Sequence, residues 1–413
     1  MIFLKNKNIL FSLAISFYIF CLVFGLKIIN IALILVILFS LFDFKEYQLI
    51  LKSYFKENKE ILFVMILLIV YQIIRAFVGD DLGDKRIGFL FLMFLSSIAL
   101  LKTKNLKFIL NSFLLSLVCL ILFGSWNIYQ YYLEADEFNM KSGGHIDPML
   151  IVARPYLGFL LNIGFLLCFY FFNSIKSKMK WIYFFIAILC IGYMFFIAIR
   201  IQILSLIFVF LIFLTFYLKV SILKKIGALL FLFIAVCSLF FINPTLKDRF
   251  EITSFEKGHV IQNLSYKEPR VIIWNCALNI TKENSFNQFF GIGNIKKIDS
   301  KLEDCYYKIN TENPIRDYFL STLFNTHNQF LEYYVVSGLV GVSLLIGLML
   351  SIGYKIRKYF IPMGLLIILI NFLIVENLFD RQIGSYFFGF TFYLIIAISS
   401  DIKKEQKKLY KST

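Results

Sequence analysis

One histidine stands where a long polar segment returns to an apolar run. His327 lies in Asn325-Thr326-His327-Asn328-Gln329, directly before the run that starts near residue 330. This position predicts His327 in the first turn of a helix at the membrane face. A helix N-terminus disfavours imidazolium and presents backbone N–H groups to an anion. His327 is therefore a candidate general base beside a phosphate site; the alternative is an interfacial residue that only caps the helix.

Two arginines are candidates for holding that phosphate. Arg200 stands alone between two apolar runs, where a charge is costly in lipid and is usually kept for a partner inside the bundle; the alternative is snorkelling to the interface. Arg270 follows Pro269 at a predicted helix start, a position that suits anion binding. Guanidinium forks match phosphate oxygens better than ammonium groups do. We expect both arginines to converge on a diphosphate, with no acidic neighbour in sequence to neutralise either.

The elements that position these residues are hydrophobic helices. The chain has 413 residues, of which 60% are hydrophobic and 16% charged, whereas soluble domains have about half and a quarter. A transmembrane helix needs about 20 apolar residues. Twelve runs approach that length: 8–26, 28–42, 61–78, 88–101, 108–126, 156–173, 181–198, 201–218, 226–243, 330–354, 360–376 and 383–400. The sequence predicts an all-α, polytopic transmembrane bundle of about twelve spans.

The basic residues predict how the bundle is oriented. The net charge is +16, but Lys and Arg occur in short clusters between apolar runs and not on one face that could bind nucleic acid. Every second connector is basic, which places those connectors and both termini in the cytoplasm. We therefore expect a multi-pass protein of the bacterial inner membrane.

The same parse divides the chain into four parts. Residues 1–243 form the first nine spans, 244–329 a large periplasmic loop, 330–400 the last three spans, and 401–413 a basic cytoplasmic tail. We expect this loop to carry functional residues, because long ordered loops are usually functional. We expect at least two helices in it. One helix begins after Pro269, and a turn follows at Gly291 and Gly293. Its predicted apolar face comprises Ile273, Trp274, Ala277 and Leu278.

The remaining polar residues give weaker signals. His145 and His259 also fall in predicted extracytoplasmic connectors. Cys276 and Cys305 share the long polar segment and either form a disulfide or stay free. The cluster Asp80, Asp81 and Asp84 is interpreted as a solvated loop. No carboxylate pair with metal-ligand spacing accompanies the candidate residues, so the sequence predicts no metal and no cofactor.

The order of these segments resembles the O-antigen ligase and polymerase superfamily, most closely the ligases. The resemblance rests on Arg200 at a helix junction, Pro269-Arg270-Val271-Ile272-Ile273-Trp274, and His327-Asn328-Gln329-Phe330-Leu331, which continues through Glu332 and Tyr333 to Ser337-Gly338-Leu339-Val340-Gly341. Glu376-Asn377-Leu378-Phe379-Asp380-Arg381-Gln382, followed by Gly384, resembles the late connector of the family. The resemblance covers residues 185–395. It departs at Ile199 and Ile201, where the family often carries Ser and Gly.

The resemblance implies a metal-independent, inverting glycosyltransferase. The donor would be a glycan on undecaprenyl diphosphate, and the acceptor a sugar hydroxyl, commonly of lipid A-core, meeting within membrane lipids at the periplasmic face. His327 would be catalytic, Arg200 and Arg270 would bind the diphosphate, and the supporting residues would be Asn328, Arg381, Glu376 and Trp274. A polysaccharide polymerase or protein O-oligosaccharyltransferase would differ only in the acceptor. A twelve-span transporter or flippase would more often show internal repeats and charges at the bilayer midplane.

Overall fold

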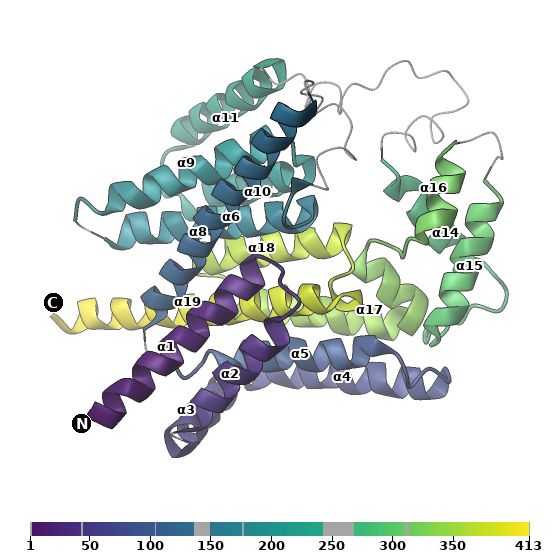
Figure 1. Ribbon diagram of the computed structural model, residues 1–413, viewed down its shortest axis with the longest axis horizontal. Helices are drawn as coiled ribbons and strands as arrows, with labels where there is room; N and C mark the ends of the chain where they lie inside the picture. Colours follow the sequence, from purple (N-terminus) through teal and green to yellow (C-terminus); the bar gives the residue numbers. More distant parts are fainter. Residues whose placement is uncertain are drawn as a thin grey trace.

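The computed structural model describes residues 2–42, 44–103, 105–135, 149–175, 177–242, 268–309 and 314–412. These residues are helical with connecting turns, and no strand occurs among them (Figure 1). The predicted all-α class is confirmed. His145 and His259 lie outside the described residues. The helices are α1 (Ile2–Val23), α2 (Ile29–Leu41), α3 (Phe44–Glu57), α4 (Lys59–Val78), α5 (Lys85–Ala99), α6 (Leu106–Ala135), α8 (Arg154–Ser174), α9 (Lys180–Phe196), α10 (Arg200–Ile212), η2 (Phe213–Tyr217), α11 (Ile222–Ile242), α14 (Arg270–Ile280), α15 (Ile295–Tyr307), α16 (Pro314–Thr322), α17 (Gln329–Ile356), α18 (Phe360–Val375), η3 (Leu378–Asp380) and α19 (Gln382–Ser412).

Each of the twelve apolar runs contains a helix of the structure. Six helices in the described part of the chain are long and apolar enough to cross a membrane: Lys59–Val78, Leu106–Leu133, Arg154–Ser174, Arg200–Tyr217, Gln329–Ile356 and Gln382–Lys407. Four other runs form shorter apolar helices, Ile9–Val23, Ile29–Leu41, Lys180–Phe196 and Phe360–Val375, and the remaining two contain α5 and α11. A multi-pass membrane protein is therefore supported, while the count of twelve spans stays a prediction. The amphipathic helix α3 lies between the apolar runs 28–42 and 61–78, in one of the basic connectors, for which the sequence predicted no helix.

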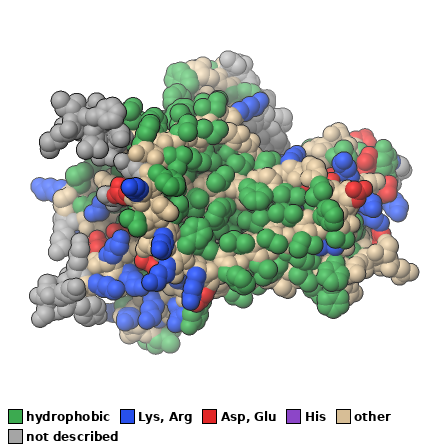
Figure 2. Space-filling model, turned by 90° about the horizontal axis from the view of Figure 1, so that it is seen from below, with side chains coloured by type: hydrophobic (Ala, Val, Ile, Leu, Met, Phe, Trp, Pro, Cys, Tyr) green, Lys and Arg blue, Asp and Glu red, His purple; other side chains and the backbone are tan. Residues whose placement is uncertain are grey.

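Charge is distributed unevenly along the molecule. Figure 2 shows a broad hydrophobic surface between an end where Lys and Arg gather and an opposite end of mixed charge. At the basic end, Lys355, Lys403 and Lys407 line one cleft with Glu57 and Asn58. Three basic connectors that are far apart in sequence therefore meet, as expected if they share one side of the membrane.

The helices α14, α15 and α16 form a separate group beside the end of the bundle (Figure 1). They have their own small apolar core, which includes Ile273, Ala277, Ile298, Leu302 and Phe319 and which packs on Val335 and Val336 of α17. The prediction of at least two helices in this segment is confirmed. The predicted apolar face of α14 is only partly correct: Ile273 and Ala277 are buried, but Leu278 is 44% exposed. Cys276 is buried in the core in place of Leu278, because it is disulfide-bonded to Cys305 of α15.

A break in α17 joins this group to the bundle. Gly338 has φ 65° and ψ −165° inside the helix, a conformation that side chains rarely adopt. The opened backbone pairs with the preceding turn: Leu339 N–H donates to the Gln288 carbonyl at 2.8 Å, and Gly293 N–H to the Val336 carbonyl at 2.8 Å. Gly291 and Gly293 also have positive φ, so the predicted turn is confirmed. These contacts fix the loop helices relative to the start of α17.

Candidate functional site

Arg200 and Arg270 occupy equivalent places on two helices. Each is the first residue of its helix, α10 and α14 respectively. Ala198 adopts φ 50°. The chain therefore leaves the helical path of α9 before Arg200, which belongs to α10. Both side chains bind the carboxylate of Glu268: Arg200 Nη2 lies 3.3 Å from Oε2, and Arg270 Nη1 lies 2.9 Å from Oε1.

Glu268 corrects one expectation from the sequence. We expected neither arginine to have an acidic neighbour, but Glu268 precedes Arg270 by two positions and pairs with both guanidinium groups. Its side chain remains 30% exposed, and those of Arg200 and Arg270 are 24% and 19% exposed. The two arginines therefore share one bound carboxylate at a site open to solvent. Two guanidiniums that share one carboxylate present several charged donors suited to an anion.

His327 is not in the first turn of α17, which corrects the sequence-based placement. That helix begins at Gln329, and the cap is Asn328, whose Oδ1 accepts from the N–H groups of Phe330 and Leu331 at 3.0 Å each. Asn328 caps the helix, and the chain turns sharply just before this residue, where His327 adopts φ 45°. The imidazole consequently projects from a tight turn. Its Nδ1 lies 3.3 Å from Oε2 of Glu376.

Glu376 connects the histidine to the arginines. It follows α18 directly, and its second oxygen, Oε1, accepts from Arg270 Nη2 at 3.1 Å. Arg270 Nε also donates to the carbonyl of Val375 at 3.2 Å. Burial opposes the charge of Glu376, but the hydrogen bond from His327 and the charges of His327, Arg270 and Arg381 outweigh it and hold its pKa below the ordinary value. Glu376 is therefore a carboxylate, and His327 Nδ1 must donate its proton to it.

The structure thus brings Arg200, Arg270 and His327 together, although 127 positions separate the first from the last in the numbering. Contacts run from Arg200 through Glu268, Arg270 and Glu376 to His327. A base oriented by a carboxylate, next to a pair of anion-binding guanidiniums, is an arrangement suited to hydroxyl attack with an anionic leaving group.

The other predicted supporting residues have different places. Asn328 caps α17 as described, and Arg381 lies close enough to Glu376 to lower its pKa. Trp274 is not brought to the arginines: it packs against the small core of the loop helices. Its buried indole N–H has no hydrogen-bond partner among the described residues.

Arg154 is a site residue that sequence reasoning missed. It is the first residue of α8, is only 7% exposed, and lies close enough to Arg200 for their charges to interact. Three helices therefore begin with an arginine near this site: α8, α10 and α14. The signal was present in the sequence, because Arg154 precedes Pro155 and a long apolar run, as Arg270 follows Pro269. A proline near a helix start and an adjacent arginine predict the same kind of helix terminus.

A second charged network fixes the elements around His327. Arg86 of α5 binds Asp84 at 2.8 Å, Glu332 of α17 at 2.6 Å and Asp380 of η3 at 3.3 Å. Asp380 Oδ2 in turn accepts from Asn325 at 2.7 Å. Four segments are tied at one point, so the turn that carries His327 is held from both sides.

The interpretation of the acidic cluster as a solvated loop holds for the exposed Asp80 but is wrong for Asp81 and Asp84. Asp81 is only 7% exposed and accepts from the Ile295 N–H at 2.9 Å, at the start of α15. Asp84 caps α5 by accepting from the Arg86 N–H at 3.0 Å. These carboxylates are structural, because each satisfies backbone donors at a helix N-terminus.

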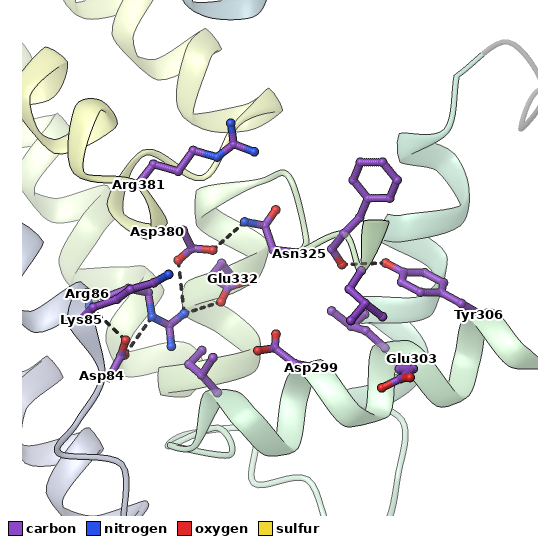
Figure 3. Close-up of a pocket in the computed structure, with 14 residues that line it drawn as sticks. Asp84, Lys85, Arg86, Asp299, Glu303, Tyr306, Asn325, Glu332, Asp380 and Arg381 are labelled. Atoms are coloured by element: carbon purple, nitrogen blue, oxygen red, sulfur yellow. Dashed lines mark hydrogen bonds and ion pairs between the residues drawn. The ribbon is translucent and has the colours of Figure 1, made fainter. Parts of the chain in front are cut away.

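A pocket of about 360 Å³ opens beside the second network. Figure 3 shows Asp299 of α15 pointing toward Arg86 and Glu332, which come from the opposite wall. Partial burial raises the pKa of Asp299; Arg86 opposes the rise, and the carboxylates of Asp380, Asp81 and Asp84 add to it. The lining residues are Asp84, Lys85, Arg86, Ile295, Asp299, Leu302, Glu303, Tyr306, Leu323, Phe324, Asn325, Glu332, Asp380 and Arg381.

Comparison with known protein families identifies the segment that carries most of this arrangement. No curated protein matches the chain. Residues 185–346, which include Arg200, Arg270 and His327, match the family described as O-antigen ligase. This match confirms, for residues 185–346, the resemblance to the O-antigen ligase superfamily that the sequence indicated.

Proposed function

We propose that this chain transfers a glycan from undecaprenyl diphosphate to a sugar hydroxyl, as an O-antigen ligase with lipid A-core as acceptor. The observation that carries the proposal is the continuous set of contacts from Arg200 through Glu268, Arg270 and Glu376 to His327. It combines an anion site with an oriented base, which are the two groups that the reaction requires.

The reaction is a single displacement. With Nδ1–H donated to Glu376, His327 Nε2 has a lone pair and takes the proton of the acceptor hydroxyl. The hydroxyl oxygen forms a bond to the anomeric carbon while the bond from that carbon to the diphosphate oxygen breaks. The electron pair leaves with the diphosphate, whose added negative charge Arg200 and Arg270 stabilise. Displacement from one side inverts the anomeric configuration. The side chains named here supply every step of this scheme.

A lipid-linked donor is supported by an apolar cleft on α10 below Arg200. The cleft has a volume of about 320 Å³ and lies between α8, α9, α10, η2 and α18. Residues Ile203, Leu206, Ile207, Phe210 and Phe213 follow Arg200 at helical spacing and all line it. A guanidinium at the head of a hydrocarbon-lined cleft matches a molecule with a diphosphate head and a polyprenyl tail. The proposed donor has this form.

We further propose that the site faces the periplasm. The disulfide between Cys276 and Cys305 supports an oxidising compartment for α14 and α15. The basic connectors gather at the other end of the molecule, which suits the cytoplasmic side. A periplasm-only reporter tests this orientation: fusions after Lys257 should be active, and fusions after Lys180 or Lys408 inactive. The reverse pattern would contradict it.

Deleting the gene and separating lipopolysaccharide on gels tests the activity. We expect loss of the high-molecular-mass ladder and accumulation of lipid-linked glycan, restored by the wild-type gene but not by His327→Ala. A single repeat unit on core would instead identify a polymerase, and loss of glycosylated protein alone an oligosaccharyltransferase. Accumulation of the glycan on the cytoplasmic leaflet would identify a flippase. An unchanged glycan profile would overturn the proposal.

A further inference from the structure

The pocket beside Arg86 has the size and position of a ligand site. Its volume of about 360 Å³ lies within the range of roughly 300–1,000 Å³ typical of small-molecule sites. One wall is α15, the other is formed by the starts of α5 and α17 and the η3 connector, and residues 323–325 close one side (Figure 3). The disulfide holds α15 to α14, so this wall is fixed relative to Arg270. The pocket therefore has a defined place next to the proposed reaction centre.

The walls offer polar groups that the fold does not use. Arg86 Nη2 is buried and has no hydrogen-bond partner among the described residues, although the rest of that guanidinium is fully engaged. Asp299 and Glu303 make no ion pair within the described part of the chain, and Lys85 is exposed beside them. Asp299, Glu303 and Lys85 therefore remain available to hydrogen-bond a ligand in the pocket.

These wall groups match the chemistry of a sugar. Hydroxyl groups both donate and accept, and the pocket supplies carboxylate acceptors, the Arg86 donor and the amide of Asn325. Phe324, Leu302 and Leu323 supply apolar surface for the C–H faces of a pyranose ring. Five carboxyl side chains face three basic ones: Asp84, Asp299, Glu303, Glu332 and Asp380 against Lys85, Arg86 and Arg381. This excess of negative charge favours a neutral or amino sugar and disfavours an anionic one.

The position relative to His327 indicates which substrate carries this sugar. Phe324 lines the pocket and its ring centre lies 5.5 Å from that of His327. Asn325 also lines the pocket, and its Oδ1 accepts from the backbone N–H of His327 at 3.2 Å. A different contact, through Glu376, joins the histidine to Arg270. The base thus lies between an anion site and an acidic pocket that repels phosphate.

We propose that this pocket binds the terminal neutral or amino sugar of the acceptor glycan and directs one of its hydroxyls to His327. The proposal rests on the proposed glycosyl transfer and adds the recognition site of its acceptor. The same chemistry could come from the first sugar of the donor. The acceptor is favoured because the base must contact the attacking hydroxyl, while the donor is anchored at its diphosphate on the arginine side.

Sugar binding is tested without turnover by saturation-transfer NMR on the full chain in detergent. The probes are N-acetylglucosamine, glucosamine and glucuronic acid. We expect signals from the first two and a weaker one from glucuronic acid. Asp299→Arg, which reverses a charge on the pocket wall, should weaken N-acetylglucosamine binding about tenfold, because a charged hydrogen bond is replaced by a clash. Glu303→Gln should give a smaller loss.

The matched control is Asp304→Asn, since Asp304 lies on the same helix, is exposed and does not line the pocket. It should bind the sugars as the wild type does. His327→Ala should also retain sugar binding, because the pocket walls remain intact. Wild-type binding by Asp299→Arg, confirmed as monodisperse, would overturn the pocket assignment, as would preferred binding of glucuronic acid.

Crosslinking distinguishes the two sources of the sugar. A photo-crosslinking amino acid in place of Glu303 is expressed in cells in which synthesis of the lipid-linked donor is blocked. We expect crosslinks to lipid A-core to persist in these cells. Crosslinks that vanish with the donor would assign the pocket to the donor sugar and overturn the acceptor assignment. If sugar binding depends on Asp299 but deleting the gene leaves glycan transfer unchanged, then the proposed function fails while a sugar site remains.

Discussion

Glu376 contacts Nδ1 of His327 at 3.3 Å, from a connector 49 residues further along the chain. The same carboxylate binds Arg270 through its other oxygen at 3.1 Å. Because one carboxylate orients the candidate base and also contacts the candidate anion site, the two parts of the proposed mechanism have a fixed geometry relative to each other.

Replacing His327 should affect turnover more than folding. General base assistance contributes about a hundredfold to ten-thousandfold, so His327→Ala should insert into the membrane and transfer glycan slowly or undetectably. His327→Gln keeps a hydrogen-bonding side chain but cannot take up a proton at neutral pH, and it should be equally slow. Transfer rates of purified variants measure this. A wild-type rate in His327→Gln would show that the residue is no base, and degradation of His327→Ala before insertion would show a structural role.

Replacing Glu376 should change both the rate and the response to acid. Glu376→Gln removes the anion that holds Nδ1–H, and we expect kcat to fall about tenfold or more. Because the pKa of Glu376 is lowered in the fold, its carboxylate stabilises the protein above its ordinary pKa, and this stabilisation is lost as the pH falls through the lowered value. Thermal stability of the wild type should therefore decline on acidification more steeply than that of Glu376→Gln. Parallel curves for both proteins would contradict the proposed charge state.

Replacing either arginine by lysine should reduce activity even though the charge remains. Arg200→Lys and Arg270→Lys lose the planar fork that binds two oxygens at once, and transfer should fall by about tenfold or more. The control is Arg357→Lys, at the opposite, basic end of the molecule, where the side chain contacts the Tyr354 carbonyl. Full activity of both site variants at normal protein levels would remove the proposed clamp.

Removing Glu268 should strengthen diphosphate binding. Its carboxylate pairs with Arg200 and Arg270 in the free protein, so an incoming phosphate must displace it. We expect Glu268→Ala to bind undecaprenyl diphosphate about severalfold more tightly than the wild type, because the competing anion is gone. Glu283→Ala, which removes the exposed ion pair with Lys301, serves as control and should leave binding unchanged. Weaker binding by Glu268→Ala would show that Glu268 supports the arginine geometry instead.

Removing the disulfide should loosen the helices that carry Arg270 and Asp299. A disulfide typically contributes roughly 2–4 kcal/mol, so the double variant Cys276→Ala and Cys305→Ala should lower the stability of this part of the protein by a similar amount. Hydrogen exchange of α14 and α15 measures the effect locally. The control is Cys119→Ala, a free cysteine in α6. Unchanged exchange in the double variant would show that the small apolar core suffices to hold the two helices.

The sequence by itself determined the features that depend on local composition and spacing. Apolar runs of sufficient length form helices wherever they occur, because backbone groups in lipid must bond within the segment. Pro269 marked the start of α14, and Gly291 and Gly293 marked a turn that requires positive φ. The order of the Arg200, Arg270 and His327 segments also sufficed to indicate the O-antigen ligase family, which residues 185–346 match.

Only the tertiary structure decided which of these residues meet. The role of Glu268 was not evident because its carboxylate joins the two arginines only once α10 approaches the start of α14, and that of Arg154 because only the fold brings it close to Arg200. Asp81 looked solvated, yet it accepts from the Ile295 N–H, since folding brings α15 against the loop that carries it, and Asp84 binds Arg86 two residues further along. His327 is predicted in the first turn of α17, but the side chain of Asn328 caps that helix and leaves the histidine outside it. The contacts of Glu268 and Arg154 with Arg200, and of Asp81 with the start of α15, join segments far apart in the chain, and local spacing carries no information about such contacts.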